Sequence, residues 1–343
     1  MSAVVPLRDA DESCGAKAAS LGRLMRAGFA VPDGVVVRDV EGGGWEPALA
    51  APGGTTYAVR SSAHGEDGHA ASYAGQFRTM LNVPATEAAA AVRRTAASVH
   101  DAGTYAAATG APAVRRMAVI VQRMLDPVAS GVAFTRHPVT GARSTVVEAV
   151  QGPGDRYMAG EVAPQRWLDG EPTGARVLTA EQARRVAREA GRVEELLGGG
   201  QDVEWAITAD GRLWLLQARP ITTTGRAAVP SPAAGRVLAT GTPAGPGTAA
   251  GPLRVVAGLD DFARFRPGDV LVCRATSPAW TPLLARAAAV VTETGGVLAH
   301  AAIVARELRI PAVTDVPAAT GLPDGVRVVV DGSTGTIAAA ERA

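Results

Sequence analysis

The segment QDVEWAITADGRLWLLQARPIT, residues 201–222, constrains the fold more than any other part of the sequence. Two runs rich in β-branched and aromatic residues flank Asp210-Gly211, a preferred pair for a two-residue type I′ turn. We therefore predict a β-hairpin here. Because side chains alternate between the two faces of a strand, one face is expected to pack on a core. The apolar positions on that face are Val203, Trp205, Ile207, Trp214 and Leu216.

The other face of the predicted hairpin is polar. Its register places Glu204 opposite Gln217, and Arg219 two residues further along, opposite Asp202. One interpretation is an ordinary solvated surface. The alternative is that Glu204 and Gln217 supply oxygens to Mg²⁺, which takes its remaining ligands from phosphates and water, while Arg219 binds a phosphate through its guanidinium fork.

Composition narrows the class of protein. The 343 residues are 47% hydrophobic and 20% charged, with 34 basic and 33 acidic side chains. This is typical of a globular protein and gives no electrostatic reason to expect nucleic acid as a partner. No apolar run reaches 18 residues and no signal peptide is recognised, so we expect no membrane association and a cytoplasmic location. Cys14 and Cys273 match no metal-binding spacing and are expected to be reduced thiols.

The chain divides most naturally at residues 222–236, a Pro- and Gly-containing stretch without helical or strand periodicity. We predict a first domain at 1–221, a flexible linker at 222–236 and a second domain at 237–343, all of mixed α/β or α+β class. The first domain is expected to contain a helix over 15–28, another that begins after Thr179, and two paired strands. These strands are predicted in RRMAVIVQRML and ASGVAFTRHP.

Further candidates for a nucleotide pocket lie upstream of the hairpin. They are a lysine early in a helix, an arginine at the end of an apolar strand, a glycine and a threonine that follow, and a glutamine where a second apolar strand ends: Lys17, Arg60, Gly75, Thr79 and Gln122. A buried arginine is costly unless it meets an anion. Taken singly, each of these residues is more often an ordinary surface or structural residue.

The segment TETGGVLAHAAIVARE contains His300 between a glycine pair and an apolar run. The pair predicts a turn before a helix whose N-terminus would favour an anion such as a phosphorylated imidazole. A neutral imidazole is also a competent nucleophile. From these residues alone a packed core histidine remains the commoner case, and both interpretations stay open.

The first domain resembles the ATP-binding domain of the phosphoenolpyruvate synthase, pyruvate phosphate dikinase and rifampin phosphotransferase superfamily, which has an ATP-grasp fold. The matching stretches are GAKAASLGRLMRAGFAVPDGVVV, YAVRSSAHGEDGHAASYAGQF, VIVQRMLDPVASGVAFTRHPVTG, VVEAVQGPG and the hairpin. The resemblance implies ATP contacts from Lys17, Arg60, Gly75, Thr79, Gln122, Glu204, Gln217 and Arg219. It also implies Mg²⁺ ligands at Glu204 and Gln217. The family's Gly-Leu-Gly-Glu is Gly152-Pro153-Gly154-Asp155 here, which leaves the role of that loop open.

The second domain resembles the swivelling β/β/α phosphohistidine domain of the same superfamily over residues 237–340. The match includes PGDVLVCRATSPAWTPLLARAAAVVTETGG and RIPAVTDV around the histidine segment. The resemblance implies that His300 attacks the β-phosphate of ATP, releases AMP, and passes a phosphate onward as the domain swings. Leu298 and Ala299 replace the hydroxyl-bearing residues that precede the histidine in the dikinase branch.

No stretch resembles an acceptor domain, so the sequence leaves the acceptor open. We expect a small-molecule acceptor, with AMP and phosphate as the other products. Three alternatives remain: a partner protein that carries the acceptor site in a split system, activation of an acceptor for condensation or dehydration, and a non-catalytic nucleotide sensor or phosphocarrier. The presence of the predicted ATP and histidine residues argues against a non-catalytic sensor.

Overall fold

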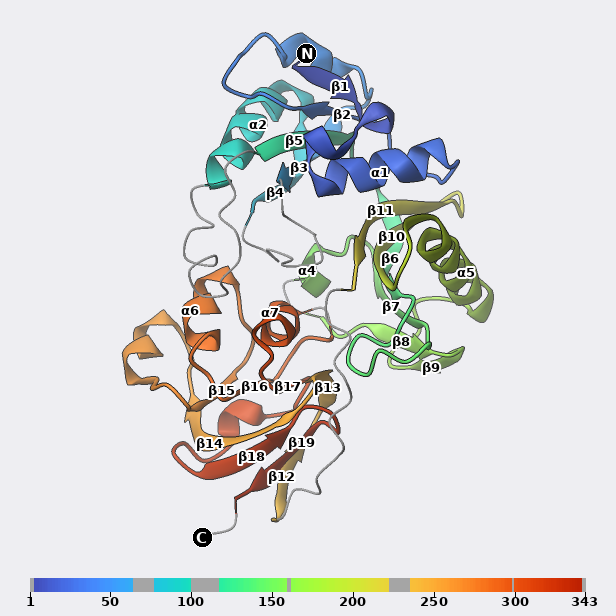
Figure 1. Cartoon of the computed structure of the whole chain (residues 1–343). Coiled ribbons are helices and arrows are strands. Elements are labelled where there is room, and N and C mark those ends of the chain that lie inside the picture. The colour runs from blue at the N-terminus through green and yellow to red at the C-terminus, as the bar shows by residue number, and fades with distance from the viewer. Residues whose placement is uncertain are drawn as a thin grey trace.

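The computed structural model of the chain describes residues 3–63, 77–99, 117–158, 162–221, 235–297 and 299–340. Three β-sheets organise these residues. Figure 1 shows two of them at the N-terminal end of the molecule and the third at the C-terminal end, with helix α7 (His300–Leu308) on the side that faces the first two. We call residues 3–221 the N-terminal part and residues 235–340 the C-terminal part.

The first sheet is antiparallel throughout, with strand order β1-β2-β5-β3-β4. Its strands are β1 (Val4–Pro6), β2 (Gly34–Val37), β3 (Thr56–Ala63), β4 (Thr79–Pro84) and β5 (Met117–Arg123). Helix α2 (Ala88–Ala97) packs on one face through its alanines and Val92. Helix α1 (Ala16–Arg26) packs on the other face and fills the space between this sheet and the second one.

The second sheet is also antiparallel, with order β11-β10-β6-β7-β8-β9. Its strands are β6 (Pro127–Phe134), β7 (Val146–Gln151), β8 (Gln165–Leu168), β9 (Glu171–Thr173), β10 (Gln201–Thr208) and β11 (Leu213–Pro220). Helix α5 (Ala180–Leu197) covers one face, and the short α4 (Asp155–Met158) follows β7. The predicted start of α5 is confirmed, because Thr179 and Gln182 form a reciprocal capping box.

The third sheet has order β12-β19-β18-β14-β15-β16-β17-β13 and is parallel from β14 to β17. Its strands are β12 (Val237–Thr240), β13 (Thr242–Gly245), β14 (Thr248–Val255), β15 (Val270–Cys273), β16 (Ala289–Thr292), β17 (Ala312–Thr314), β18 (Arg327–Asp331) and β19 (Thr336–Ala339). Helices α6 (Thr281–Leu284) and α7 pack on one face. Short 3₁₀ helices occur at Leu7–Asp9, Glu12–Cys14, Glu46–Ala50, Ala85–Glu87, Leu259–Arg264, Pro278–Trp280 and Ala319–Gly321.

The mixed α/β composition agrees with the predicted fold class, but one strand pairing was predicted wrongly. β5 and β6 do not pair: β5 lies between β2 and β3 of the first sheet, whereas β6 lies between β10 and β7 of the second. The three residues between them carry the chain from one sheet to the other instead of folding it back. Since Met124 backbone N–H donates to the Thr56 carbonyl, the connection leaves the first sheet still hydrogen-bonded to it.

The hairpin of β10 and β11 has the predicted polar pairing but not the predicted turn. Glu204 lies opposite Gln217, and Asp202 lies opposite Arg219. The turn is longer than two residues, because Thr208 backbone N–H donates to the Arg212 carbonyl and Asp210 lacks the positive φ that a type I′ turn requires. The Asp210 carboxylate instead accepts from the Thr208 hydroxyl and the Arg212 N–H.

A β-bulge compensates for this longer turn. Trp205 pairs with Leu215, so Leu216 is the extra residue on β11 and restores the register at Glu204. Because of the bulge, the residues of β11 that enter the core differ from the predicted ones. Leu213 and Leu215 enter the main core with Val203, Trp205 and Ile207, whereas the predicted Trp214 and Leu216 do not.

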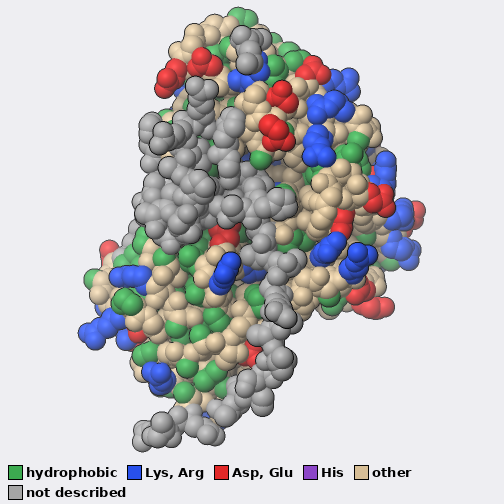
Figure 2. All heavy atoms as spheres, viewed as in Figure 1, with side chains coloured by type: hydrophobic (Ala, Val, Ile, Leu, Met, Phe, Trp, Pro, Cys, Tyr) green, Lys and Arg blue, Asp and Glu red, His purple; other side chains and the backbone are tan. Residues whose placement is uncertain are grey.

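The sequence analysis also made predictions about surface charge, membrane association, the cysteines and the domain boundaries. In Figure 2, basic and acidic side chains lie interspersed on the visible face of the N-terminal part. Among the described residues, no helix is both long enough and apolar enough to span a bilayer. Cys14 and Cys273 are buried free thiols. The division at 1–221, 222–236 and 237–343 stays a prediction, and residues 222–234 of the linker lie outside the described residues.

Candidate active site

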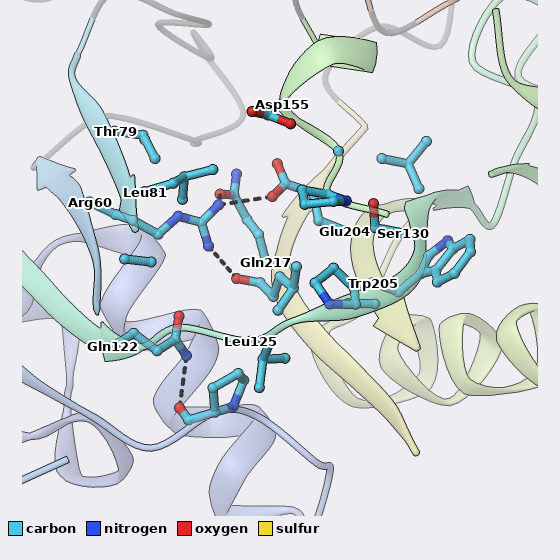
Figure 3. Close-up of a pocket in the computed structure, with 18 of the residues that line it drawn as sticks. Arg60, Thr79, Leu81, Gln122, Leu125, Ser130, Asp155, Glu204, Trp205 and Gln217 are labelled. Atoms are coloured by element: carbon cyan, nitrogen blue, oxygen red, sulfur yellow. Dashed lines mark hydrogen bonds and ion pairs between the residues drawn. The ribbon is translucent and has the colours of Figure 1, made fainter. Parts of the chain in front are cut away.

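A cavity of about 430 Å³ lies between the first and second sheets, within the size range of small-molecule sites. Strands β3, β4, β5, β6, β10 and β11 line it, and Figure 3 shows their side chains pointing into it. The β5–β6 connection contributes Met124 and Leu125. The chain crossing that sequence analysis missed therefore forms one wall of the cavity. Ile303 of α7, in the C-terminal part, also reaches the cavity lining.

Lys17 is buried in the lining of this cavity, with 6% of its surface exposed. The first turn of α1 is fixed to β3, because the Ser62 hydroxyl donates to the Cys14 carbonyl and accepts from the Ala18 N–H. Gly15 permits this close approach, since a Cβ there would lie 2.3 Å from the Ser62 carbonyl oxygen, and its φ of +82° favours glycine. The sequence GAK thus sets the position of the lysine, which is also the only lysine in the chain.

Arg60 connects the two sheets across the cavity. Its Nη2 donates to Glu204 Oε2 at 2.8 Å and to Gln217 Oε1 at 2.9 Å, as Figure 3 shows. Its Nη1 donates to the carbonyl of Leu216 at 2.6 Å. Because Leu216 is the bulged residue, its carbonyl is not engaged in the regular ladder at that point and can accept from the guanidinium.

The pair Glu204 and Gln217 fits the predicted metal site. Their side-chain oxygens converge on one cationic group, the Arg60 guanidinium, and a carboxylate oxygen beside an amide oxygen is a donor set suited to Mg²⁺. Among the described residues, no group of three or more His, Cys, Asp or Glu side chains could hold a metal ion. A magnesium ion at Glu204 and Gln217 would therefore take its other ligands from phosphates and water.

Arg219 lines the cavity and is held by Asp202, whose Oδ2 accepts from its Nε at 2.9 Å. Both side chains are nearly buried, and burial raises the pKa of Asp202 while Arg219 opposes that rise. Arg306 of α7 interacts electrostatically with the same pair, and burial lowers the pKa of Arg306 to about 10. Its guanidinium donates to the carbonyls of Ala244 and Val297. The hairpin and the histidine-bearing helix thus lie within electrostatic reach of each other.

The remaining predicted nucleotide residues are placed differently from one another. Gln122 is buried in the cavity lining, where its Nε2 donates to the Pro32 carbonyl at 2.8 Å. Thr79 lines the cavity at the start of β4 and is exposed. Gly75 lies outside the described residues. Asp155, in the loop whose role was left open, also lines the cavity, as Figure 3 shows.

His300 is the first residue of α7 and is 9% exposed. Its Nδ1 lies 2.9 Å from the Thr276 hydroxyl, whereas its Nε2 is buried and has no hydrogen-bond partner among the residues that the structure describes. Burial lowers the pKa of His300 to about 4, so the ring is neutral at pH 7. If Nδ1 carries the proton and donates to Thr276, then Nε2 presents a free lone pair. A buried polar atom without a partner calls for an explanation, and a catalytic role is one such explanation.

The histidine and the cavity belong to one connected region. Ile303 lies one turn after His300 on the same face of α7, lines the cavity, and packs against Tyr157 and other apolar residues of the N-terminal part. Thr276, which lies 24 positions before the histidine, is not marked by any sequence pattern. Asp202 was recognised only as the residue opposite Arg219 on the hairpin, and Asp155 only as a departure from a family pattern.

These features define a class: a nucleotide-binding protein of the ATP-grasp type, joined to an α/β part that presents a histidine at the start of a helix. Residues 48–176 and 169–236 match the family described as pyruvate phosphate dikinase, AMP/ATP-binding domain. Residues 265–335 match the PEP-utilising enzyme, mobile domain. The chain therefore belongs to the phosphoenolpyruvate synthase and pyruvate phosphate dikinase superfamily.

Curated relatives agree with this assignment. The chain is 36% identical to a probable phosphoenolpyruvate synthase of Archaeoglobus fulgidus over 82% of its own length and 43% of the relative. The corresponding values are 35%, 82% and 44% for the phosphoenolpyruvate synthase of Aeropyrum pernix. They are 33%, 83% and 42% for that of Escherichia coli K12. The chain thus spans less than half the length of these relatives.

Among solved structures, the D-alanine–D-alanine ligase from Coxiella burnetii is similar with a TM-score of 0.36 and 13% identity. The similarity covers 61% of this chain and 47% of the ligase chain, and the score is too low to bear on the fold.

Proposed function

We propose that the protein is an ATP-dependent phosphotransferase that moves the β-phosphate of ATP through His300 to a small-molecule acceptor, with release of AMP and phosphate. One observation carries this proposal. The buried, unpartnered Nε2 of His300 belongs to a neutral imidazole, on a helix that reaches the lining of a cation-rich cavity. A core histidine would be expected to satisfy both ring nitrogens.

The cavity supplies groups suited to ATP. Lys17, Arg60 and Arg219 bring three positive charges to one cavity, where they would bind the phosphates and stabilise charge that develops during transfer. Gln122, Thr79 and Gly75 would complete the nucleotide contacts. Mg²⁺, held by Glu204 and Gln217, would neutralise phosphate charge when bound. Arg60 would then exchange its present partners for phosphate oxygens, so the same oxygens become available to the metal.

The transfer step follows from the state of His300. The lone pair of Nε2 attacks the β-phosphorus of ATP, the bond from that phosphorus to the bridging α–β oxygen breaks, and AMP leaves with the bond electrons. Thr276 fixes the ring through Nδ1 while Nε2 reacts. Water or phosphate then takes the outer phosphoryl group, and the phosphoryl group that remains on the ring passes to the acceptor.

The proposal is tested by incubation of the protein with ATP labelled separately at the β- and γ-phosphates. The expected result is acid-labile protein label from the β position together with AMP release, with both lost in His300→Ala. ADP as the only nucleotide product would contradict the proposal, as would equal labelling of the variant. Adding candidate small molecules, or separate proteins, to the labelled enzyme then shows which of them removes the label. Removal that requires a protein would replace the small-molecule acceptor by a partner-borne site.

Nucleotide binding can be tested apart from the chemistry. Because Lys17 is the only lysine, an amine-reactive reagent can modify only this side chain and the N-terminal amine. ATP with Mg²⁺ is expected to slow modification of Lys17 but not of the N-terminus, as measured by peptide mass spectrometry. Unchanged modification of Lys17 at saturating ATP would place the nucleotide elsewhere.

A further inference from the structure

A buried polar cluster lies where the two parts of the chain meet, and one of its members, Tyr157, also lines the nucleotide cavity. The cluster consists of Glu148 on β7, Tyr157 on α4 and Arg166 on β8. The Glu148 side chain is fully buried, its Oε1 accepts from Arg166 Nε at 2.7 Å, and its Oε2 accepts from the Tyr157 hydroxyl. Burial and the neighbouring carboxylate raise the pKa of Tyr157 well above its usual value, so the hydroxyl keeps its proton.

The glycine pair before His300 meets this cluster, and its two members have different surroundings. Gly295 has a φ of +112°, and a Cβ there would lie 2.7 Å from the Cβ of Ala299, so its requirement arises within the C-terminal part. A Cβ on Gly296 would lie 3.3 Å and 3.4 Å from the Glu148 carboxylate oxygens and 3.4 Å from the Tyr157 hydroxyl oxygen. All three of these nearest atoms belong to the N-terminal part. Gly296 is thus constrained by contact between the parts.

Apolar contacts surround this meeting point. Val297 follows the glycine pair, and Ile303 lies one turn after His300; both pack into a cluster with Tyr157, Val139 and Val132. The polar contact at Gly296 therefore has an apolar surround that excludes water. His300 lies between Val297 and Ile303 in the sequence and is itself 9% exposed.

We propose that Glu148, Tyr157 and Arg166 form a docking seat for the Gly295–Gly296 turn, and that this seat positions His300 at the nucleotide cavity. The physical basis is the internal satisfaction of the carboxylate. Since both oxygens of Glu148 are already bonded to groups of the N-terminal part, the turn can cover them without leaving a buried charge unpaired. A contact that must form and separate repeatedly needs groups that are satisfied in both states. Glu148 and Tyr157 are positioning residues in this scheme.

The seat rests on the proposed function for its purpose, but its geometry can be tested from both sides of the contact. Gly296→Ala adds a methyl group against the seat, and Tyr157→Phe removes the hydroxyl that binds Glu148. Gly321→Ala is the matched control, because a Cβ there has no atom within 4 Å and its φ is ordinary. Thermal unfolding of each variant reports whether the fold is retained, and either seat variant suffices if the other fails to fold.

Two measurements are made on each variant. The first is the single-turnover rate of protein labelling from β-labelled ATP, at saturating nucleotide. The second is the rate at which diethyl pyrocarbonate modifies His300, followed by peptide mass spectrometry, which needs no ATP. We expect about tenfold slower labelling and about tenfold faster modification for Tyr157→Phe, which removes a hydrogen bond to a charged group, and changes in the same directions for Gly296→Ala, which displaces the turn from the seat. Gly321→Ala is expected to match the unmodified protein in both.

The double variant sharpens the test. If both substitutions disturb one contact, Gly296→Ala with Tyr157→Phe should slow labelling by less than the product of the single effects. Unchanged His300 modification in both single variants would overturn the seat, whatever happens to labelling, and so would faster modification with unchanged labelling. If the unmodified protein takes no label at all, the proposed function fails, and the modification rates still decide whether the cluster holds the turn.

Discussion

The nucleotide cavity and the histidine, the two regions proposed to react, are built in opposite ways. At the nucleotide cavity, Arg60 already has three hydrogen-bond acceptors, and Arg219 is paired with Asp202. At the histidine, one ring nitrogen has a single hydroxyl partner and the other has none. The cationic side chains Arg60 and Arg219 are paired with carboxylates, although Arg60 Nε and Asp202 Oδ1 lack a partner among the described residues, whereas the neutral histidine is hydrogen-bonded through Nδ1 alone.

This difference indicates how the two regions are expected to respond to ATP. An unpaired charge is costly in a buried site, so the charged groups of the cavity form ion pairs with one another. Binding of phosphate and Mg²⁺ would rearrange these pairs. Burying a neutral imidazole costs far less free energy than burying a charge, so Nε2 can remain without a hydrogen-bond partner before ATP binds. Binding of ATP in the cavity is therefore expected to require an exchange of ion-pair partners, whereas reaction of the histidine requires correct placement of its ring. The following variants test each side of that contrast.

The largest effect is expected at the histidine. His300→Ala removes the only nitrogen proposed to accept phosphate, so protein labelling from β-labelled ATP should fall to background while ATP protection of Lys17 is retained. His137→Ala is the control, since His137 lies in the loop after β6 and its Nδ1 accepts backbone N–H groups of that same loop. Loss of labelling in the control, or loss of ATP protection in His300→Ala, would break the separation between the two regions.

A smaller effect is expected from Arg60→Lys. Lysine keeps the charge but cannot reach the three present acceptors with a rigid fork, so labelling should slow roughly 100-fold, the scale for loss of one transition-state donor. Arg93→Lys is the matched control, because Arg93 forms an exposed ion pair with Glu46. A labelling rate within twofold of that of the unmodified protein corresponds to a difference of about 0.4 kcal/mol in activation free energy. Such a rate would show that partner exchange at Arg60 is unimportant.

A hydroxyl deletion tests how the ring is held. Thr276→Val keeps the side-chain shape and removes the Nδ1 partner, so labelling should slow about tenfold, the value of one hydrogen bond. Thr314→Val, on β17 of the third sheet, is the control, because Thr314 is fully buried and its hydroxyl has no partner among the described residues. Single-turnover rates at saturating ATP make the comparison. If both variants behave alike, Thr276 acts only through packing.

The smallest effect concerns pH. Burial lowers the pKa of His300 to about 4, whereas an exposed imidazole has a pKa near 6.5. A group with a lowered pKa favours the buried state fully above the exposed value and loses that contribution as pH falls toward the buried one. Labelling should therefore reach half its maximum below pH 6.5. Gly296→Ala is expected to move the midpoint upward. A midpoint at or above 6.5 in the unmodified protein would contradict the burial of the reacting ring.

Much of the fold could be predicted from local sequence patterns. The capping box at Thr179 and the pairing of Glu204 with Gln217 follow from residues close together in sequence, and both were predicted. The turn at Asp210 was not, because the Asx-type hydrogen bonds at Asp210 outcompeted the type I′ geometry that Asp-Gly usually favours. The paired residues nevertheless agreed, since the bulge at Leu216 offset the longer turn.

Contacts between residues far apart in the sequence could not be predicted from local patterns. Nothing near Asp126 indicated that β5 and β6 enter different sheets, because two apolar runs joined by a short connection also fit a hairpin. The contacts of His300 with Thr276, and of Gly296 with Glu148, join residues whose separation in sequence follows no period. Family resemblance supplied the histidine and most of the nucleotide residues. It did not supply the docking cluster, whose members become neighbours only when the two parts meet.

The central claim is that the unpartnered Nε2 of His300 accepts phosphate from ATP bound at Arg60, Glu204 and Gln217. The most direct measurement is tandem mass spectrometry of the ATP-treated protein under alkaline conditions that preserve phosphohistidine. Phosphate is expected on His300 in the unmodified protein and in Arg93→Lys, with a strongly reduced amount in Arg60→Lys after the same short incubation. Phosphate on any other residue, or none on His300 in the unmodified protein, would contradict the claim.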